Sequence, residues 1–289
     1  MQLGLVSIQR NRGPWLVEWF AFHYLVGFRK FYFYAHLCDD DTHELLLKLA
    51  SKFDIQSFVM ASVQDKVQLA AYQHACDHFM HDVDWMCFLD GDEFIFPTQH
   101  LDLASALEEY EAVPISGLGV YNRNFGSSGH IQEPTGLITE NYRFRADPNF
   151  LPQRRIKSLV KGKQTISIGS NSHLFTTPLG TVDELQRPIT WGYMPDYEPS
   201  YEKFQINHYV CQSRSYFLEF KKNSGHADAS ANAVREEIWW DNFNSNAVAD
   251  HSLTRYCQPL RDFVEKINAE LELPNLPPVP FTRPQAHQN

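Results

Sequence analysis

Three carboxylates follow a run of apolar residues in the first third of the chain. Residues 85–89 read as a buried strand, and Asp90, Asp92 and Glu93 come directly after it. Carboxylates this close raise one another's pKa values, and a divalent cation between them removes that cost. Because Mg²⁺ and Mn²⁺ favour carboxylate oxygens, Asp90 and Asp92 are candidate metal ligands. A solvated turn is the alternative, since Asp-Gly is common turn chemistry.

The elements that must position these acids alternate between strand and helix. Strands are expected over residues 3–8, 31–34, 55–60 and 85–89, with helices over residues 15–26, around 42–49 and 64–81. Such alternation predicts βαβ units and a mostly parallel sheet flanked by helices. Right-handed crossovers place the loops after the strands at one sheet edge, where ligands bind. The polar loops 9–13, 39–42 and 90–94 should therefore converge there.

The chain beyond residue 110 has shorter elements separated by Gly, Pro and Asn. Strand candidates cover residues 115–122, 136–145, 156–160, 164–168 and 173–175, and they predict an extended sheet or a small antiparallel layer. Helices are expected over residues 213–222, with Ser213 as N-cap, and over residues 235–243 and 260–273. The proline-containing stretch 178–200 is expected to be a long loop.

The expected organisation is one domain over residues 1–272 and a proline-rich tail over residues 273–289. Within the domain, residues 1–110 would form the nucleotide-binding half and residues 111–272 the acceptor half.

Composition argues against several classes of partner. The 35 acidic and 25 basic residues give a net charge of −10, which disfavours binding to nucleic acid or to anionic membranes. No apolar run is long enough to span a membrane, and the first residues lack the features of a signal peptide. The five cysteines form no C-x-x-C pair, so reduced cysteines and a cytoplasmic location are expected.

An ordered set of motifs resembles the glycosyltransferases of the GT-A fold, with most similarity to family-2-like and family-92-like enzymes. The resemblance extends over roughly residues 3–255. The motifs are Gly-Pro-Trp-Leu-Val-Glu-Trp at 13–19 with Phe22, His23 and Gly27; Asp41-Thr42 after the Tyr34 strand; Gln68 with Tyr72; residues 88–94; residues 125–130; Asn207-His208-Tyr209 with Ser213; and Phe220-Lys221-Lys222 with Gly225.

This resemblance implies a metal-dependent transferase. It would move a sugar from a nucleotide-diphosphate sugar, most simply a uridine nucleotide, to an acceptor hydroxyl with inversion, in surface polysaccharide or glycan synthesis. Asp90, Asp92 and His208 would hold Mn²⁺ or Mg²⁺. From the residues alone, His208 reads as a core histidine. The implied donor-binding residues are Asn11, Arg12, Asp39, Asp41, Gln68, Asp90, Lys221 and Lys222.

The catalytic base is expected among carboxylates of the second half of the chain. An inverting transferase needs a carboxylate that takes the proton from the attacking hydroxyl. Asp228 is the first candidate because it lies close to the proposed ligand helix, and Glu133 and Asp241 are further candidates. Lys157 is a weaker phosphate-binding candidate, and Glu93 is expected to support the metal site.

Two other functions fit part of the pattern. A haloacid-dehalogenase-type phosphatase also places Asp-x-Asp after a strand and uses the first Asp as nucleophile, but Phe94 stands where Thr or Val is usual. A non-catalytic module that binds a nucleotide or carbohydrate would keep the fold without the chemistry.

Overall fold

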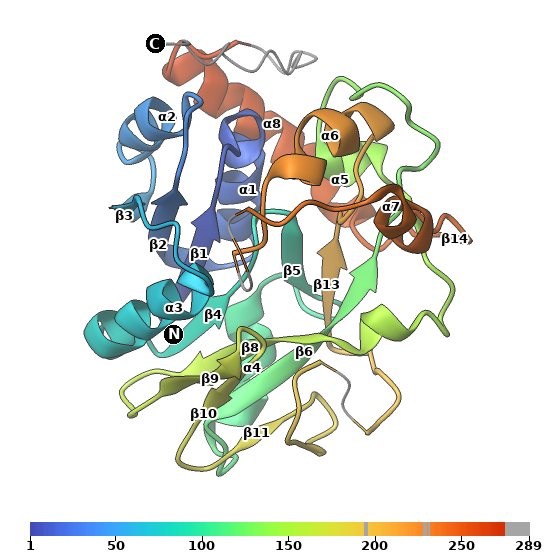
Figure 1. Cartoon of the computed structure of the whole chain (residues 1–289). Coiled ribbons are helices and arrows are strands. Elements are labelled where there is room, and N and C mark those ends of the chain that lie inside the picture. The colour runs from blue at the N-terminus through green and yellow to red at the C-terminus, as the bar shows by residue number, and fades with distance from the viewer. Residues whose placement is uncertain (194–195, 228–229, 231, 275–289) are drawn as a thin grey trace.

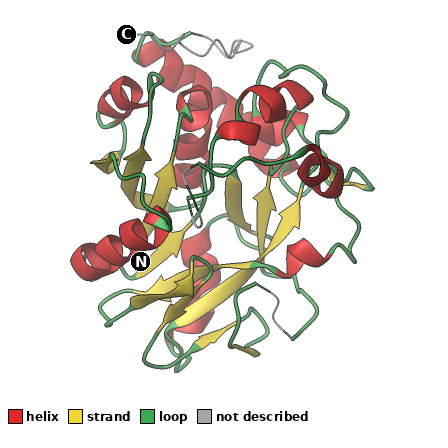
Figure 2. Cartoon of the chain, in the orientation of Figure 1, coloured by secondary structure: helices red, strands yellow, loops and turns green. Residues whose placement is uncertain are grey.

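The computed structural model of the chain describes residues 1–193, 196–227, 230 and 232–274. It has a mixed α/β fold in which helices lie on both sides of a central sheet (Figures 1 and 2). The α/β class expected from the sequence is therefore confirmed. Asp228 and most of the expected tail lie outside the described residues.

The first part of the chain forms four neighbouring parallel strands in the order β4-β1-β2-β3. The helices between these strands begin and end close to the predicted positions. The strands are β1 (Leu3–Gln9), β2 (Phe28–His36), β3 (Asp54–Met60) and β4 (Trp85–Phe88), and the helices are α1 (Gly13–Leu25), α2 (Thr42–Leu49) and α3 (Val67–Phe79), followed by a 3₁₀ turn, η1 (Met80–Asp82).

The sheet continues through strands of mixed direction. Strand β8 pairs antiparallel with β4 and β6, and β13 pairs parallel with β6 and antiparallel with β5. The pairs β9–β10 and β7–β14 form two small antiparallel sheets, which confirms the predicted extra layer. These strands are β5 (Glu93–Pro97), β6 (Gly117–Asn124), β7 (Phe144–Arg145), β8 (Ile156–Lys161), β9 (Ser167–Asn171), β10 (Leu174–Thr176), β11 (Thr181–Val182), β12 (Pro188–Ile189), β13 (Phe204–His208) and β14 (Val248–Ala249).

The remaining helices cover both the sheet and the pocket described below. Helix α8 packs against α1, so the described C-terminal part returns to the first βαβ unit (Figure 1). The elements are α4 (Leu103–Glu111), α5 (Ile138–Asn141), η2 (Leu151–Arg154), α6 (Arg214–Glu219), η3 (Lys221–Asn223), α7 (Glu237–Phe243) and α8 (Thr254–Glu270).

The two faces of the sheet carry separate cores because successive side chains of a strand point to opposite faces. Along β1, Leu3 and Leu5 join the cluster that includes α1, α4 and α8, whereas Val6 and Ile8 join the cluster that includes α3. Strands buried on both faces are typical of a parallel sheet covered by helices. This double burial explains why the strands of the first half are nearly continuous apolar runs.

The prediction of a strand over residues 136–145 is wrong. Residues Ile138–Asn141 form the short helix α5, and only Phe144–Arg145 are extended. The buried carboxylate of Glu18 accepts hydrogen bonds from the backbone N–H groups of Ile138 (2.7 Å) and Thr139 (2.9 Å). Because this cap comes from a residue 120 positions away, the local sequence pattern gives no sign of it.

The helix expected over residues 213–222 is shorter than predicted. Ser213 does cap it, since its Oγ accepts a hydrogen bond from the Tyr216 N–H, but α6 ends at Glu219. Phe220 leaves helical geometry, with φ −120° and ψ −68°, and a 3₁₀ turn then follows. This break sends two consecutive lysines, Lys221 and Lys222, in different directions.

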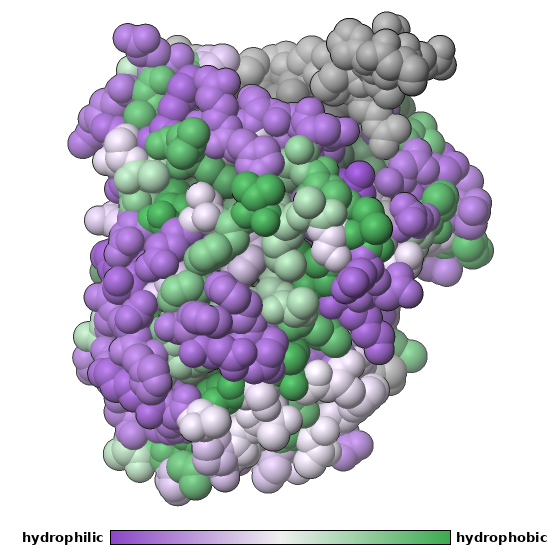
Figure 3. Space-filling model, turned by 60° about the vertical axis from the view of Figure 1, so that its left-hand side comes forward, coloured by the Kyte–Doolittle hydropathy of each residue, from purple (hydrophilic) through white to green (hydrophobic). Residues whose placement is uncertain are grey.

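Large exposed apolar side chains are present at several separate positions of the chain, among them Leu47 (75%), Val59 (73%) and Ile131 (70%). Figure 3 shows one face of the molecule, on which apolar residues gather toward the middle of the view with hydrophilic residues around them. No helix in the described ranges is both long and apolar enough to cross a lipid bilayer.

Candidate active site

The three predicted polar loops meet at one edge of the sheet. Arg12 donates a hydrogen bond to the carbonyl oxygen of Gly91 (3.0 Å), which joins the loop after β1 to the loop after β4. The Gly13 N–H donates to the Asp40 carboxylate (3.0 Å), which joins the loop after β1 to the loop after β2. The predicted convergence is therefore confirmed. It follows from parallel strands whose carboxyl ends share one edge.

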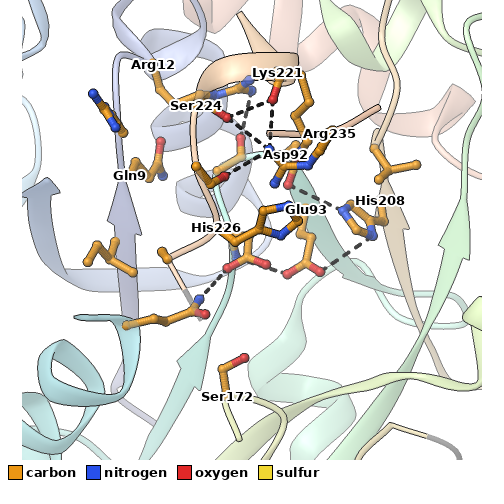
Figure 4. A pocket seen from close by; sticks show the side chains of 18 of the residues that line it. Gln9, Arg12, Asp92, Glu93, Ser172, His208, Lys221, Ser224, His226 and Arg235 are labelled. Atoms are coloured by element: carbon orange, nitrogen blue, oxygen red, sulfur yellow. Dashed lines mark hydrogen bonds and ion pairs between the residues drawn. The ribbon is translucent and has the colours of Figure 1, made fainter. Parts of the chain in front are cut away.

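Asp92 is the most strongly held carboxylate of this edge. It is 6% exposed, and its Oδ2 lies 2.5 Å from Lys221 Nζ while its Oδ1 lies 3.5 Å from His208 Nε2. Burial alone would raise the pKa of Asp92, but the nearby Lys221, His208 and Arg12 hold that pKa well below its ordinary value. Asp92 is therefore a carboxylate that stays charged inside the pocket wall (Figure 4).

Asp90 faces a different set of partners. Its Oδ2 lies 2.7 Å from Lys157 Nζ, and its Oδ1 accepts a hydrogen bond from Gln68 Nε2 (2.7 Å). Lys157 is 1% exposed and also lies 3.2 Å from the buried Glu93. Burial would lower the pKa of Lys157, but Asp90 and Glu93 hold it well above its ordinary value. Lys157 is thus a buried counter-ion of the acidic turn.

Two of the three predicted metal ligands lie together. Asp92 and His208 present a carboxylate and an imidazole to the same space, whereas Asp90 is turned toward Lys157 and Gln68. Across the described ranges, no group of three or more His, Cys, Asp or Glu side chains is arranged to hold a metal ion. Asp92 and His208 therefore form a pair of adjacent groups of the kinds that divalent cations accept as ligands.

Arg12 places a buried positive charge beside the acidic turn. Its guanidinium donates to Tyr216 Oη (2.8 Å) as well as to the Gly91 carbonyl oxygen, and it lies over the ring of Trp15 at 4.2 Å. Planar stacking and a fork of N–H donors are the properties that suit arginine to phosphate recognition. Arg12 and Lys221 together give this side of the pocket the charge that a diphosphate needs.

Gly91 leaves room for a side chain that packs against the turn. A Cβ at this position would lie 2.4 Å from Gln9 Oε1 and 2.5 Å from Gln9 Cδ. The glycine between the two aspartates therefore allows the side chain at the end of β1 to pack directly against the turn. The amide of Gln9 donates in turn to Ser7 Oγ (3.0 Å), and that hydroxyl donates to the Leu89 carbonyl oxygen (2.8 Å).

A pocket of about 240 Å³ is lined by the acidic turn together with Gln9, Arg12, His208, Tyr216 and Lys221, whereas Lys157 is not among the lining residues. Figure 4 shows Arg12, Lys221 and Arg235 gathered on one side of this pocket, with Asp92 and His208 facing them and Ser172 at the opposite side. The remaining lining side chains include His36, Gln68, Asn122, Arg155, His173, His226, Trp239 and Phe243.

Several predicted donor-binding residues lie beside the pocket without lining it. Asn11 and Asp39 hydrogen-bond to each other, and the Asp39 N–H donates to Asn11 Oδ1 (2.8 Å). Asp41 precedes α2 close to Gly13. Lys222 lies 3.4 Å from Glu237 on α7, so only its neighbour Lys221 reaches the acidic turn. The structure brings Arg12, Gln68, Asp90, Asp92, His208 and Lys221 together in the lining.

The predicted catalytic bases that the structure describes do not line the pocket. Glu133 is held by Ser213 Oγ (2.6 Å) and Tyr142 Oη (2.9 Å) and is not among the lining residues, and burial raises its pKa. Asp241 is exposed on α7. Asp228 lies outside the described residues, directly after Ala227, which does line the pocket.

Sequence reasoning missed part of the lining. Arg235, Ser224 and His226 come from the segment around η3 and α7, in which the motifs include Phe220-Lys221-Lys222 and Gly225 but none of these three residues. Asn122 and Arg155 come from strand β6 and the residue before β8. The polar Asn-Arg-Asn end of the otherwise apolar strand β6 was the signal that could have indicated Asn122.

Solved structures have weak similarity to the chain, and two of them serve as examples. The structure titled "Crystal structure of S. aureus TarS 1-349 in complex with UDP-GlcNAc" is 11% identical, with a TM-score of 0.42, over 93% of this chain and 73% of that chain. The structure of HddC from Yersinia pseudotuberculosis is 10% identical, with a TM-score of 0.33, over 55% of this chain and 76% of that chain.

Curated proteins match about half of the chain. The glycosyltransferase family 92 protein RCOM_0530710 of Ricinus communis is 29% identical over 163 residues, which is 55% of this chain and 28% of that protein. The family 92 protein Os08g0121900 of Oryza sativa is 27% identical over 54% of this chain and 26% of that protein. The chain thus spans little more than a quarter of these relatives' length. The sequence model of glycosyltransferase family 92 matches residues 6–242, and the chain belongs to that family.

Proposed function

We propose that this chain transfers a sugar from a nucleotide-diphosphate sugar, with uridine as the base, to a hydroxyl group of a glycan acceptor. The observation that supports the proposal most strongly is the environment of the Asp92 carboxylate. A charged, buried carboxylate lies between an imidazole and a lysine at the sheet edge where α/β folds bind ligands. Family membership makes a transferase a better explanation of this site than a phosphatase.

The cationic side of the pocket would receive the diphosphate. Negative charge develops on the leaving diphosphate as the bond to the sugar breaks, and fixed positive groups stabilise it. Lys221 and Arg12 are positioned for this role, because Lys221 contacts Asp92 and Arg12 contacts the Gly91 carbonyl oxygen. When Mn²⁺ or Mg²⁺ is bound, it would supply further charge neutralisation, and Asp92 and His208 are the residues that would hold it.

Asp90 and Gln68 would bind the nucleotide beside the diphosphate. Gln68 lies on α3 and fixes Asp90 through a 2.7 Å hydrogen bond, so the partly exposed Asp90 carboxylate can accept from a hydroxyl of the nucleotide.

Inversion at the sugar carbon requires a base on the acceptor side. Asp228 remains the first candidate because it follows Ala227 of the lining, and Glu133 is the second. Surface polysaccharide or another glycan is the proposed product.

A thermal-shift screen tests the proposal. Uridine, guanosine and cytidine diphosphates are added with and without Mn²⁺, because a ligand that binds the folded state must raise the melting temperature. We expect a metal-dependent shift with UDP that is absent in Asp92→Asn and unchanged in Asp77→Asn, an exposed residue of α3. A shift of equal size without metal, or no shift with any nucleotide, would contradict the proposal.

Turnover separates the transferase from a non-catalytic relative. A transferase releases UDP slowly from its donor sugar by hydrolysis and faster with an acceptor present. Asp228→Asn is expected to abolish the acceptor-dependent release while nucleotide binding is retained. Metal-dependent binding with no release of UDP from any donor sugar would favour the binding module.

A further inference from the structure

The polar groups of the pocket divide into two kinds. Cationic side chains gather on the side of Arg12, Lys221 and Arg235, and their positive charge favours anionic ligands (Figure 4). Ser172 lies at the opposite side (Figure 4), and His173, Asn122 and Arg155 also line the pocket. The side chains of Asn122 and His173 present neutral acceptors, which suit a ligand rich in hydroxyl groups rather than a phosphate.

Asn122 has a buried acceptor without a donor. This residue of β6 is 1% exposed, and its Nδ2 lies 3.4 Å from Glu93 Oε1, which orients the side-chain amide. Its Oδ1 is buried and receives no hydrogen bond from any side chain or backbone group of the described residues. A buried acceptor without a donor is unfavourable for the folded chain. A ligand hydroxyl that reached this atom would supply the missing donor.

His173 is fixed with one ring nitrogen available. Its Nδ1 lies 2.7 Å from the Ile156 carbonyl oxygen, which can only accept, so Nδ1 carries the proton and Nε2 carries the lone pair. The backbone N–H of His173 donates to Asn171 Oδ1 (2.9 Å), and its carbonyl oxygen accepts from Ser158 Oγ (2.7 Å). The ring is therefore held in place before any ligand arrives.

The environment of His173 keeps the ring neutral. Burial and the positive charge of Lys157 lower the pKa of His173 to about 3, so Nε2 remains an acceptor at neutral pH. Gly192 allows a close approach on the other side of this residue, since a Cβ there would lie 2.7 Å from His173 Cβ. The Tyr193 ring lies 4.5 Å from the imidazole ring.

The two acceptors are tied to adjacent carbonyl groups. The Asn122 N–H donates to the Arg155 carbonyl oxygen (3.1 Å), and His173 Nδ1–H donates to the carbonyl oxygen of the next residue, Ile156. Their separation is therefore set by the start of β8. Strands β6 and β8 lie on the opposite side of β4 from β1 and β2, whose loops would receive the nucleoside.

We propose that Asn122 Oδ1 and His173 Nε2 accept hydrogen bonds from hydroxyl groups of a sugar and thereby select which sugar the pocket admits. This inference rests on the proposed function, and it assigns the sugar subsite to β6 and the residues that flank β9. A phosphate oxygen carries no proton to donate at neutral pH, whereas each sugar hydroxyl does. The sugar could belong to the donor or to the acceptor, and the experiment separates these sources.

The test uses calorimetric titration of the whole chain with Mn²⁺ present. The variants are Asn122→Leu, His173→Phe and the conservative His173→Gln, which keeps an acceptor. The control is Asn124→Leu, since Asn124 is buried two residues further along β6 and does not line the pocket. The probes are UDP, UDP-glucose, UDP-galactose and the deoxy forms of the sugar that binds best. If Asn122→Leu does not fold, Asn122→Ala takes its place.

A donor-sugar subsite predicts a specific pattern. Asn122→Leu and His173→Phe keep the affinity for UDP within about twofold, and each weakens the preferred UDP-sugar about tenfold, as expected for one lost hydrogen bond. One deoxy sugar should lose affinity for the wild type but not further for the variant, because the two changes remove the same contact. His173→Gln should recover part of the loss, and Asn124→Leu should show none.

A second titration uses methyl glycosides of the same sugars at saturating UDP. Losses confined to these ligands would assign the acceptors to the acceptor sugar and support the inference in that form. Equal weakening of UDP and UDP-sugars, or unchanged affinity for every sugar ligand, would overturn it. Failure of the wild type to bind UDP at all would instead contradict the proposed function.

Discussion

Two groups of carboxylates in this molecule are neutralised in different ways. Asp92 and Asp90, at the carboxyl edge of the sheet, are held by side chains: Lys221, His208, Lys157 and Gln68. Glu184, after β11, is held mainly by backbone: its carboxylate accepts from the N–H groups of residues 202, 203 and 204 at 2.7–3.0 Å. The neighbouring Asp183 combines both kinds of partner, since it accepts from the N–H groups of Leu185 and Arg187 and also forms an ion pair with the Arg187 guanidinium at 2.6 Å.

The difference separates a structural carboxylate from one that is able to bind a ligand. A backbone N–H cannot leave its acceptor without moving the chain, so Glu184 is fixed for as long as the loop is folded. A lysine side chain can turn away and be replaced by another cation, and the Lys221 side chain is 14% exposed at the pocket. We therefore expect changes at the sheet edge to affect binding and changes at Glu184 to affect stability.

The largest expected effect is that of Asp92→Asn on donor turnover. The change removes the negative charge while keeping the size, so the site can no longer hold a metal–diphosphate unit. We expect release of UDP from its sugar to fall about 10²–10³-fold, the range for removing one stabilising group from an active site. Donor hydrolysis followed by chromatography measures this effect, with melting temperature recorded beside it. A large loss of stability with normal activity per folded molecule would break the comparison.

Glu184→Ala should have the opposite profile. It leaves three backbone N–H groups and Ser200 Oγ without their acceptor, and a buried donor left unsatisfied costs about 1–3 kcal/mol. Urea unfolding should show this loss, while UDP affinity of the folded fraction stays the same. The control is Glu109→Ala, a half-exposed partner of Lys203, for which a surface ion pair predicts less than about 1 kcal/mol. Similar losses in both variants would contradict the assignment.

His23 allows the same comparison for a buried imidazole. Burial alone keeps its ring neutral. Burial lowers the pKa of His23 to about 3, well below the ordinary value of 6.5. As pH falls from 6.5, the unfolded chain gains a proton here that the folded chain cannot accept, so stability is lost toward acid. One pKa unit corresponds to about 1.4 kcal/mol, so the loss reaches about 2 kcal/mol at pH 5.

His23→Phe should remove this part of the acid sensitivity. The ring lies 5.6 Å from Phe94 and 5.8 Å from Phe28, so a phenyl ring is compatible with its surroundings. Urea unfolding at pH 7 and pH 5 measures the effect, with the exposed His81→Gln as control. An unchanged pH dependence in His23→Phe would show that other groups cause the acid sensitivity.

The smallest expected effect compares the two adjacent lysines of η3. Lys221→Met removes the ammonium that lies 2.5 Å from Asp92, and we expect UDP affinity to fall about tenfold, or about 1.4 kcal/mol. Lys222→Met removes a cation that lies 3.4 Å from Glu237, and we expect less than a twofold change. Calorimetry at fixed ionic strength measures both. Equal losses would mean that general charge, rather than the contact with Asp92, governs affinity.

The parts of the fold predicted from the sequence are those set by local pattern. Apolar strands that alternate with helices placed β1 to β4, and parallel pairing then brought the loops at Arg12 and Asp92 together. The cap at Ser213 was also predicted, because N-capping depends on one residue and the next turn.

The parts that were missed depend on contacts between distant residues. Helix α5 is capped by Glu18, and Lys157 reaches Asp90 across 67 positions. The pairing of β13 with both β5 and β6 joins Asn207 to Phe94 and Arg123. No local periodicity encodes such partners, so the buried counter-ion and the β6 side of the pocket required the structure.

The most direct test of the central claim is the binding of Mn²⁺ itself. Electron paramagnetic resonance detects the loss of the free Mn²⁺ signal, and the titration uses wild type, Asp92→Asn and Lys222→Met, each with and without UDP. We predict one Mn²⁺ bound per chain in the presence of UDP in wild type and in Lys222→Met, and none at the same concentrations in Asp92→Asn. Equal binding of Mn²⁺ in wild type and Asp92→Asn would contradict the account, because Asp92 would then not hold the metal.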